Sequence, residues 1–153
     1  MNKMHKLEIT EQDFDIGAEI EHLKRSSVGA IASFVGIVRD YQSGPELTSL
    51  TLEHYPGMTE HEIERIMQDA GQRWSLAAVT VIHRVGRLTP QENIVFVGTA
   101  SAHRKAAFES AHFIMDYLKT QAPFWKQEET TAGSQWVDAR VEDDDALAKW
   151  TQS

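Results

Sequence analysis

The most informative stretch for the fold is Met115-Asp116-Tyr117-Leu118-Lys119-Thr120-Gln121-Ala122-Pro123-Phe124-Trp125-Lys126. Pro123 predicts the end of a long helix, because proline removes a backbone donor and clashes with the preceding turn. Lys119 falls in the last turn of this helix, and Lys126 follows the proline after two aromatic residues. The whole chain has 15 Lys and Arg residues against 23 Asp and Glu residues. Two lysines around one aromatic turn of an acidic chain indicate a site for an anionic ligand.

The start of the same helix is a second basic segment. We place this helix at residues 102–120, with the side chain of Ser101 capping its first turn. His103 and Arg104 then fall in the first turn, where free backbone N–H groups favour an anion. A cation at this end of a helix costs ~0.3–1 kcal/mol. The pair therefore indicates either an anion site or two surface residues that tolerate the cost, and the sequence leaves both interpretations open.

The rest of the chain predicts strands clustered between helices. Ile63, Ile66 and Met67 recur at helical spacing, and Thr59 with Glu62 fits a capping box at the start of their helix. Alternating or continuous apolar runs predict the strands. The expected strands are 7–9, 28–38, 47–54, 79–85, 94–100, 124–129 and 135–137, and the other expected helices are 14–25 and 143–150. This order predicts an α+β fold with a largely antiparallel sheet, in one domain spanning residues 1–153.

Composition excludes several classes of protein. The net charge of −8 argues against nucleic-acid binding, which needs a basic surface. Cysteine is absent, which excludes disulfides and thiolate catalysis. We expect no membrane span, because no apolar run approaches the ~20 residues required, no signal peptide, and a cytoplasmic location. The segment His61-Glu62-Ile63-Glu64-Arg65 lacks the second histidine of a zincin motif, so we expect no metal site and no resident cofactor.

The lysines are the candidates for chemistry. Lys119 has a structural alternative, because the helix dipole favours a cation at a helix C-terminus, whereas Lys126 has none. A lysine desolvated against aromatic rings has a lowered pKa and can act as a base or nucleophile near neutral pH. Arg39 ends a strand and opens a loop, a common position for binding residues. His54 and His83 lie on predicted strands, and we interpret them as structural histidines. Residue chemistry alone thus predicts an anion-binding domain with candidate lysine chemistry.

Five motifs in order resemble one protein family. They are Ser33-Phe34-Val35-Gly36-Ile37-Val38-Arg39, Leu52-Glu53-His54-Tyr55-Pro56-Gly57-Met58, Val81-Ile82-His83-Arg84-Val85-Gly86, Ser101-Ala102-His103-Arg104 and the stretch 115–126. Together they closely resemble the large, catalytic subunit of molybdopterin synthase, the MoaE family, from about residue 14 to residue 150. The fold that this resemblance implies is an α+β fold of the α/β-hammerhead type.

The resemblance implies a sulfurtransferase. Proteins of this family install the two dithiolene sulfurs of molybdopterin on cyclic pyranopterin monophosphate, in molybdenum cofactor biosynthesis. The sulfur arrives as a thiocarboxylate on the C-terminal Gly-Gly tail of a small ubiquitin-like subunit of the MoaD type, and that tail inserts into a pocket of the large subunit. The implied assembly is a heterotetramer, built from a homodimer of large subunits with one small subunit at each end. The absence of cysteine fits an enzyme whose partner delivers the sulfur.

The resemblance also implies a set of site residues. Lys119 and Lys126 match the family's active-site lysines, without a division of the acid and base roles between them. Ile37 and Gln127 stand where some relatives have lysine and arginine. The implied substrate-binding residues are Phe34, Ile37, Val38, Arg39, His103, Arg104, Gln127, Glu128 and, contributed across the dimer, Arg140.

Two other functions remain open at this point. A non-catalytic module would bind the tail of a small protein, for example by strand pairing with the segment around Phe124 and Trp125. A phosphate-binding enzyme unrelated to sulfur transfer would act without a thiocarboxylated partner. Turnover, measured with and without such a partner, separates these functions.

Overall fold

A computed structural model of the protein describes residues 4–40, 44–137, 147, 148 and 150. Within these residues no helix is long and apolar enough to cross a membrane. The predicted final helix, 143–150, falls largely outside them. In chain order the elements are β1 (Met4–Thr10), α1 (Ile16–Leu23), β2 (Ala30–Ile37), β3 (Leu47–His54), α2 (Met58–Arg73), β4 (Ala78–Arg84), β5 (Gly86–Leu88), β6 (Asn93–Ser101), α3 (Arg104–Thr120), β7 (Phe124–Thr130) and β8 (Gly133–Val137).

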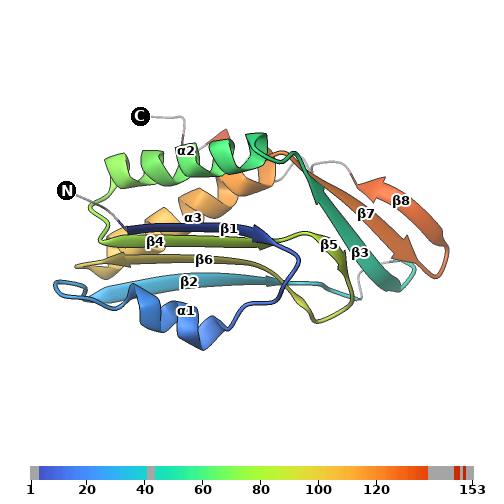
Figure 1. Ribbon diagram of the computed structural model, residues 1–153, viewed down its shortest axis with the longest axis horizontal. Helices are drawn as coiled ribbons and strands as arrows, with labels where there is room; N and C mark the ends of the chain where they lie inside the picture. Colours follow the sequence, from blue (N-terminus) through green and yellow to red (C-terminus); the bar gives the residue numbers. More distant parts are fainter. Residues whose placement is uncertain (1–3, 41–43, 138–146, 149, 151–153) are drawn as a thin grey trace.

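The strands form two sheets, where the sequence predicted one. The first sheet has the order β1-β4-β6-β2, and the second has the order β5-β3-β7-β8. β1 runs parallel to β4, and all other neighbouring strands are antiparallel. The second sheet lies beyond one end of the first (Figure 1). The α+β class and the largely antiparallel pairing are confirmed.

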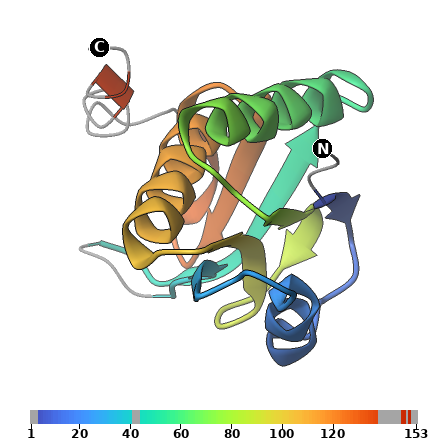
Figure 2. The ribbon, with the colours of Figure 1, turned by 90° about the vertical axis from the view of Figure 1, so that its left-hand side faces the viewer.

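Helices cover both faces of the first sheet. α2 and α3 lie against one face and α1 against the other (Figure 2). Side chains alternate along β4, so that Val79 and Val81 pack in the core under α2 and α3, whereas Ala78 and Ile82 pack in the core under α1. The same alternation places His83 on the face of α3.

The chain passes from the first sheet to the second at three points. Gly86 has a φ of 88° and is the first residue of β5, which belongs to the second sheet. This left-handed backbone conformation favours glycine, because a Cβ would be strained there. The other passages lead from β2 to β3 and, through Pro123, from α3 to β7. The ends of β2, β4 and α3 therefore meet the start of β7 where the two sheets join.

Both predicted helix caps are wrong. The N-cap of α2 is Gly57, whose N–H donates to Oε1 of Glu60 at 2.8 Å. The hydroxyl of Thr59 is occupied elsewhere, because it accepts from the N–H of Tyr55 and donates to the carbonyl oxygen of Pro123. This contact ties the start of α2 to the turn that follows α3.

Ser101 is the second incorrect cap. It is the last residue of β6, and its hydroxyl donates to the carbonyl oxygen of Ser75 at 2.8 Å. The N-cap of α3 is His103, whose side chain makes no capping hydrogen bond. The helix consequently begins at Arg104, two residues later than predicted.

Candidate active site

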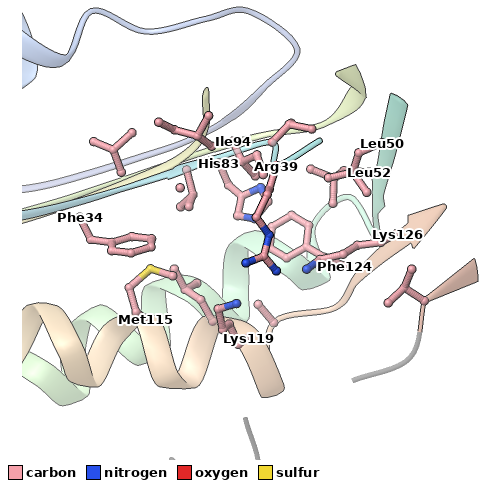
Figure 3. A pocket seen from close by; sticks show the side chains of 18 of the residues that line it. Phe34, Arg39, Leu50, Leu52, His83, Ile94, Met115, Lys119, Phe124 and Lys126 are labelled. Carbon is pink, nitrogen blue, oxygen red and sulfur yellow. The ribbon is translucent and has the colours of Figure 1, made fainter. Parts of the chain in front are cut away.

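A pocket of about 550 Å³ lies at the junction of the two sheets. Its walls come from the ends of β2 and β4, from β3 and β7, and from the last turns of α3 (Figure 3). Seven of the predicted site residues line it, namely Phe34, Ile37, Val38, Arg39, Lys119, Lys126 and Glu128. The structure thus brings together residues from the motifs 33–39 and 115–126, which are far apart in the sequence.

Three cations face this pocket. Arg39 follows β2, Lys119 lies in the last turn of α3 and Lys126 is on β7, and their charged ends point toward one another (Figure 3). Arg39 and Lys119 form no ion pair with any residue that the structure describes. Arg39 and Lys119 carry like charges that repel each other, so an anion placed between them is favoured. The predicted anion site therefore has a physical basis in this geometry.

The rest of the pocket lining is largely apolar. Phe34 and Met115 line it from β2 and α3, and Leu50 and Leu52 contribute from β3 (Figure 3). Phe34, on the edge strand β2, has 42% of its surface exposed. An exposed ring beside converging cations suits a ligand that has both a flat apolar part and a negative charge.

His83 lies in the same pocket wall. Its ring stacks on that of Phe124, with the centroids 3.8 Å apart and an interplanar angle of 15°. Nδ1 lies 2.8 Å from the carbonyl oxygen of Arg84, which makes Nδ1 the protonated nitrogen of the neutral ring. Burial, assisted by the nearby charges of Lys126 and His54, lowers the pKa of His83 from 6.5 to about 4, against the opposing effect of that hydrogen bond. The imidazole is therefore neutral at physiological pH.

β7 presents alternate side chains to the pocket. Phe124, Lys126 and Glu128 line it, so Trp125 and Gln127 lie on the opposite face of the strand. β8 pairs with β7 from Lys126 to Thr130. Strand pairing of an incoming peptide near Phe124 and Trp125 is consequently restricted to the two residues that precede the β8 ladder.

Three of the predicted site residues that the structure describes are not in this pocket. His103 and Arg104 are exposed at the opposite end of α3 from Lys119, about 22 Å away at ~1.5 Å per residue. Gln127 lies on the far face of β7. Arg140 lies outside the described residues. Within one chain, His103, Arg104 and Gln127 do not share a site with the lysines.

Sequence reasoning missed His83, Phe124 and Met115 as pocket residues. His83 was interpreted as structural. This holds for Nδ1, which has a backbone partner, whereas Nε2 forms no hydrogen bond with any described residue. The available signal was its spacing, because Val79, Val81 and His83 share one face of β4. Phe124 and Met115 carry the same kind of signal, since each lies two or four residues from a pocket lysine. The described residues contain no group of three or more histidine, aspartate or glutamate side chains able to hold a metal ion.

Known proteins similar to this chain share one description. The family model described as MoaE protein matches residues 9–121. A molybdopterin synthase catalytic subunit from Ralstonia nicotianae is 53% identical over 149 residues, covering 96% of this chain and 85% of its own length. The subunit of the same name from Escherichia coli is 51% identical over 146 residues, covering 95% and 97%. The solved structure of a molybdopterin biosynthesis MoaE protein from Burkholderia ambifaria has a TM-score of 0.83 and 49% identity, covering 98% of this chain and all of that one.

Fold and site define an α+β domain of two joined sheets with a cationic pocket at their junction. The chain belongs to the MoaE family, the family of molybdopterin synthase catalytic subunits. The family predicted from the five sequence motifs, and its fold, are confirmed.

Proposed function

We propose that this protein is the catalytic subunit of a molybdopterin synthase. It transfers sulfur from the C-terminal thiocarboxylate of a small ubiquitin-like subunit to cyclic pyranopterin monophosphate, and so forms the dithiolene of molybdopterin. The observation that carries this proposal is the convergence of Arg39, Lys119 and Lys126 on one pocket in a chain of the MoaE family. The phosphate of the precursor and the thiocarboxylate of the carrier are both anions that such a pocket attracts.

The three cations have different roles: one binds the substrate and two take part in the chemistry. Arg39 has a planar fork of donors that suits a phosphate oxygen pair. Lys119 and Lys126 flank the reacting centre, where they stabilise the negative charge that develops as the thiocarboxylate sulfur displaces an oxygen of the pterin side chain. Water then hydrolyses the acyl–sulfur bond and leaves a carboxylate on the carrier. Either lysine can also deliver the proton that the departing oxygen needs or accept the proton that the water loses.

A second copy of the chain completes the site. Because His103 and Arg104 lie about 22 Å from Lys119 along α3, one chain cannot place all the family's substrate residues around one ligand. A two-fold dimer that brings the start of one α3 to the pocket of its partner would unite them. The small subunit then docks on each protomer with its Gly-Gly tail in the pocket. We expect this heterotetramer in the cytoplasm.

Reconstitution tests the function. This protein is mixed with the thiocarboxylated small subunit and the pyranopterin precursor, and the dithiolene product is measured by mass spectrometry. We expect product only when all three components are present. Product without the thiocarboxylated partner would mean a different phosphate-binding enzyme, and partner binding without product would mean a non-catalytic binding module.

A further inference from the structure

The pocket is rich in hydrogen-bond donors and poor in acceptors. Arg39, Lys119 and Lys126 can only donate when charged. Among the other described side chains that line the pocket, just two offer a nitrogen or oxygen acceptor, the carboxylate of Glu128 and the imidazole of His83. Phosphate and thiocarboxylate groups need donors, but the N–H and O–H groups of a reduced heterocycle need acceptors. Acceptors in this pocket are therefore scarce relative to what the proposed substrate requires.

His83 is held in one orientation. Its stacked contact with Phe124 sets the plane of the ring, at a centroid distance of 3.8 Å. The hydrogen bond from Nδ1 to the carbonyl oxygen of Arg84, at 2.8 Å, sets the rotation within that plane and the tautomer. Nε2 then carries the lone pair, and no hydrogen bond from a described residue occupies it. These two independent contacts therefore fix the direction of Nε2, an unoccupied acceptor in the wall of the pocket.

The neutral state of this acceptor is stable near physiological pH. Burial, the largest cause, lowers the pKa of His83 to about 4. Lys126 on β7 and His54 on β3 both disfavour a positive charge on His83. Arg39, after β2, and the carboxylate of Glu128, on β7, line the same pocket. Nε2 consequently stays unprotonated while the pocket itself remains cationic.

We propose that His83 is a substrate-contacting residue, whose Nε2 accepts a hydrogen bond from an N–H or O–H group on the heterocycle of the precursor. This inference rests on the proposed function and extends it. The cations hold the anionic groups of the two reactants, and His83 fixes the orientation of the uncharged ring system between Phe34 and the lysines. His83 thereby selects a heterocycle with a donor at that position over a simple phosphate.

Two substitutions of similar size separate this role from a structural one. His83→Asn keeps an amide donor near the position of Nδ1 and removes the acceptor at Nε2. His83→Gln can place an amide oxygen near the position of Nε2. We measure the dissociation constant of the pyranopterin precursor by titration of the pterin fluorescence, and we measure the affinity for the small subunit separately.

We expect precursor binding to weaken about 10- to 100-fold in His83→Asn, the cost of leaving a buried donor unpaired. In His83→Gln the loss should stay within about threefold, because the amide oxygen restores an acceptor. Affinity for the small subunit should be unchanged in both. Equal losses in the two variants, or losses of turnover with unchanged precursor affinity, would overturn the proposal.

A measurement on the wild-type protein tests the same contact even if the variants fail to fold. In the protein labelled with nitrogen-15 in histidine, the Nε2 resonance of His83 should move when the precursor is added and should not move with inorganic phosphate alone. An unmoved resonance while the precursor binds would refute the contact and leave the sulfurtransferase function standing. A wild-type protein that neither binds nor converts the precursor would instead refute the proposed function, and this inference with it.

Discussion

The imidazole of His83 and the phenyl ring of Phe124 stack at a centroid distance of 3.8 Å, across the junction of the two sheets. His83 is on β4 of the first sheet and Phe124 opens β7 of the second. Pro123, which ends α3, brings Phe124 to this position. The stack therefore connects the segment 119–126, which has a lysine at each end, to β4, which carries the neutral acceptor.

Removal of the Phe124 ring should change the protonation of His83. Burial is the largest cause of the low pKa of His83, which lies at about 4. In Phe124→Ala water reaches the imidazole, and we expect its pKa to rise toward the ordinary value of 6.5. The pKa is followed by a nuclear magnetic resonance titration of the ring. Trp125→Ala, which alters the opposite face of the same strand, is the control and should leave the pKa of His83 in place.

Acid should destabilise the protein through the same residue. The unfolded chain binds a proton at His83 near pH 6.5, but the folded chain binds it only near pH 4. Between these values the unfolded state holds more protons, so stability falls as the pH falls through this window and is unaffected by His83 above it. The loss is on the order of 3 kcal/mol at most. Urea unfolding at several pH values measures it.

The matched variant for this measurement is His83→Gln, which cannot titrate. Its stability should decline less than that of the wild type between pH 6.5 and pH 4. Parallel declines in the two proteins would show that His83 titrates normally in the folded state. The other histidines of the chain contribute equally to both proteins and cancel from the difference.

The aromatic core of α3 should dominate stability. Phe113 is fully buried and packs edge-on against Trp74 and Trp150, with the guanidinium of Arg73 4.6 Å from its ring centroid. We expect Phe113→Ala to cost about 3–5 kcal/mol of unfolding free energy, the usual cost of deleting a buried aromatic ring. Phe108, on the same helix, has 67% of its surface exposed. Phe108→Ala should therefore change stability by no more than about 0.5 kcal/mol in the same denaturant experiment.

A site shared between protomers can be detected by complementation. Lys119→Ala and Arg104→Ala should each be nearly inactive alone. After the subunits exchange, a mixed dimer contains one site with both substitutions and one site with neither. We expect an equimolar mixture to regain roughly a quarter of wild-type activity, the statistical share of intact sites in a two-fold dimer. Activity that stays at the level of the separate variants would place both residues in the same protomer's site.

Local patterns in the sequence predicted the helices and most strands. Ile63, Ile66 and Met67, chosen for their helical spacing, are all fully buried on α2. The division into two sheets could not be read from such patterns, because it depends on pairings between distant strands such as β3 with β7. β5 was not predicted, because its three residues, which follow the expected strand 79–85, show no strand pattern of their own. The caps failed because the hydroxyls of Thr59 and Ser101 bond to residues far away in sequence.

The candidate site, like the fold, could be predicted from the sequence only in part. Arg39, Lys119 and Lys126 were selected by position and by family resemblance, and they do line one pocket. The role of His83 needed the structure, because only the folded chain shows which of its two ring nitrogens is occupied. The separation of Arg104 from Lys119 already followed from the predicted helix, which carries them at its two ends, and α3 has them there.

The most direct test of the sulfurtransferase function is product formation in a single-turnover reconstitution with Lys119→Ala. Lys24→Ala is its control, because Lys24 is an exposed lysine paired with Glu21 on the far side of the first sheet. We expect dithiolene product from the wild type and from Lys24→Ala at equal rates, and a loss of at least about 100-fold in Lys119→Ala. Near-normal product from Lys119→Ala would contradict the assignment of the chemistry to this pocket.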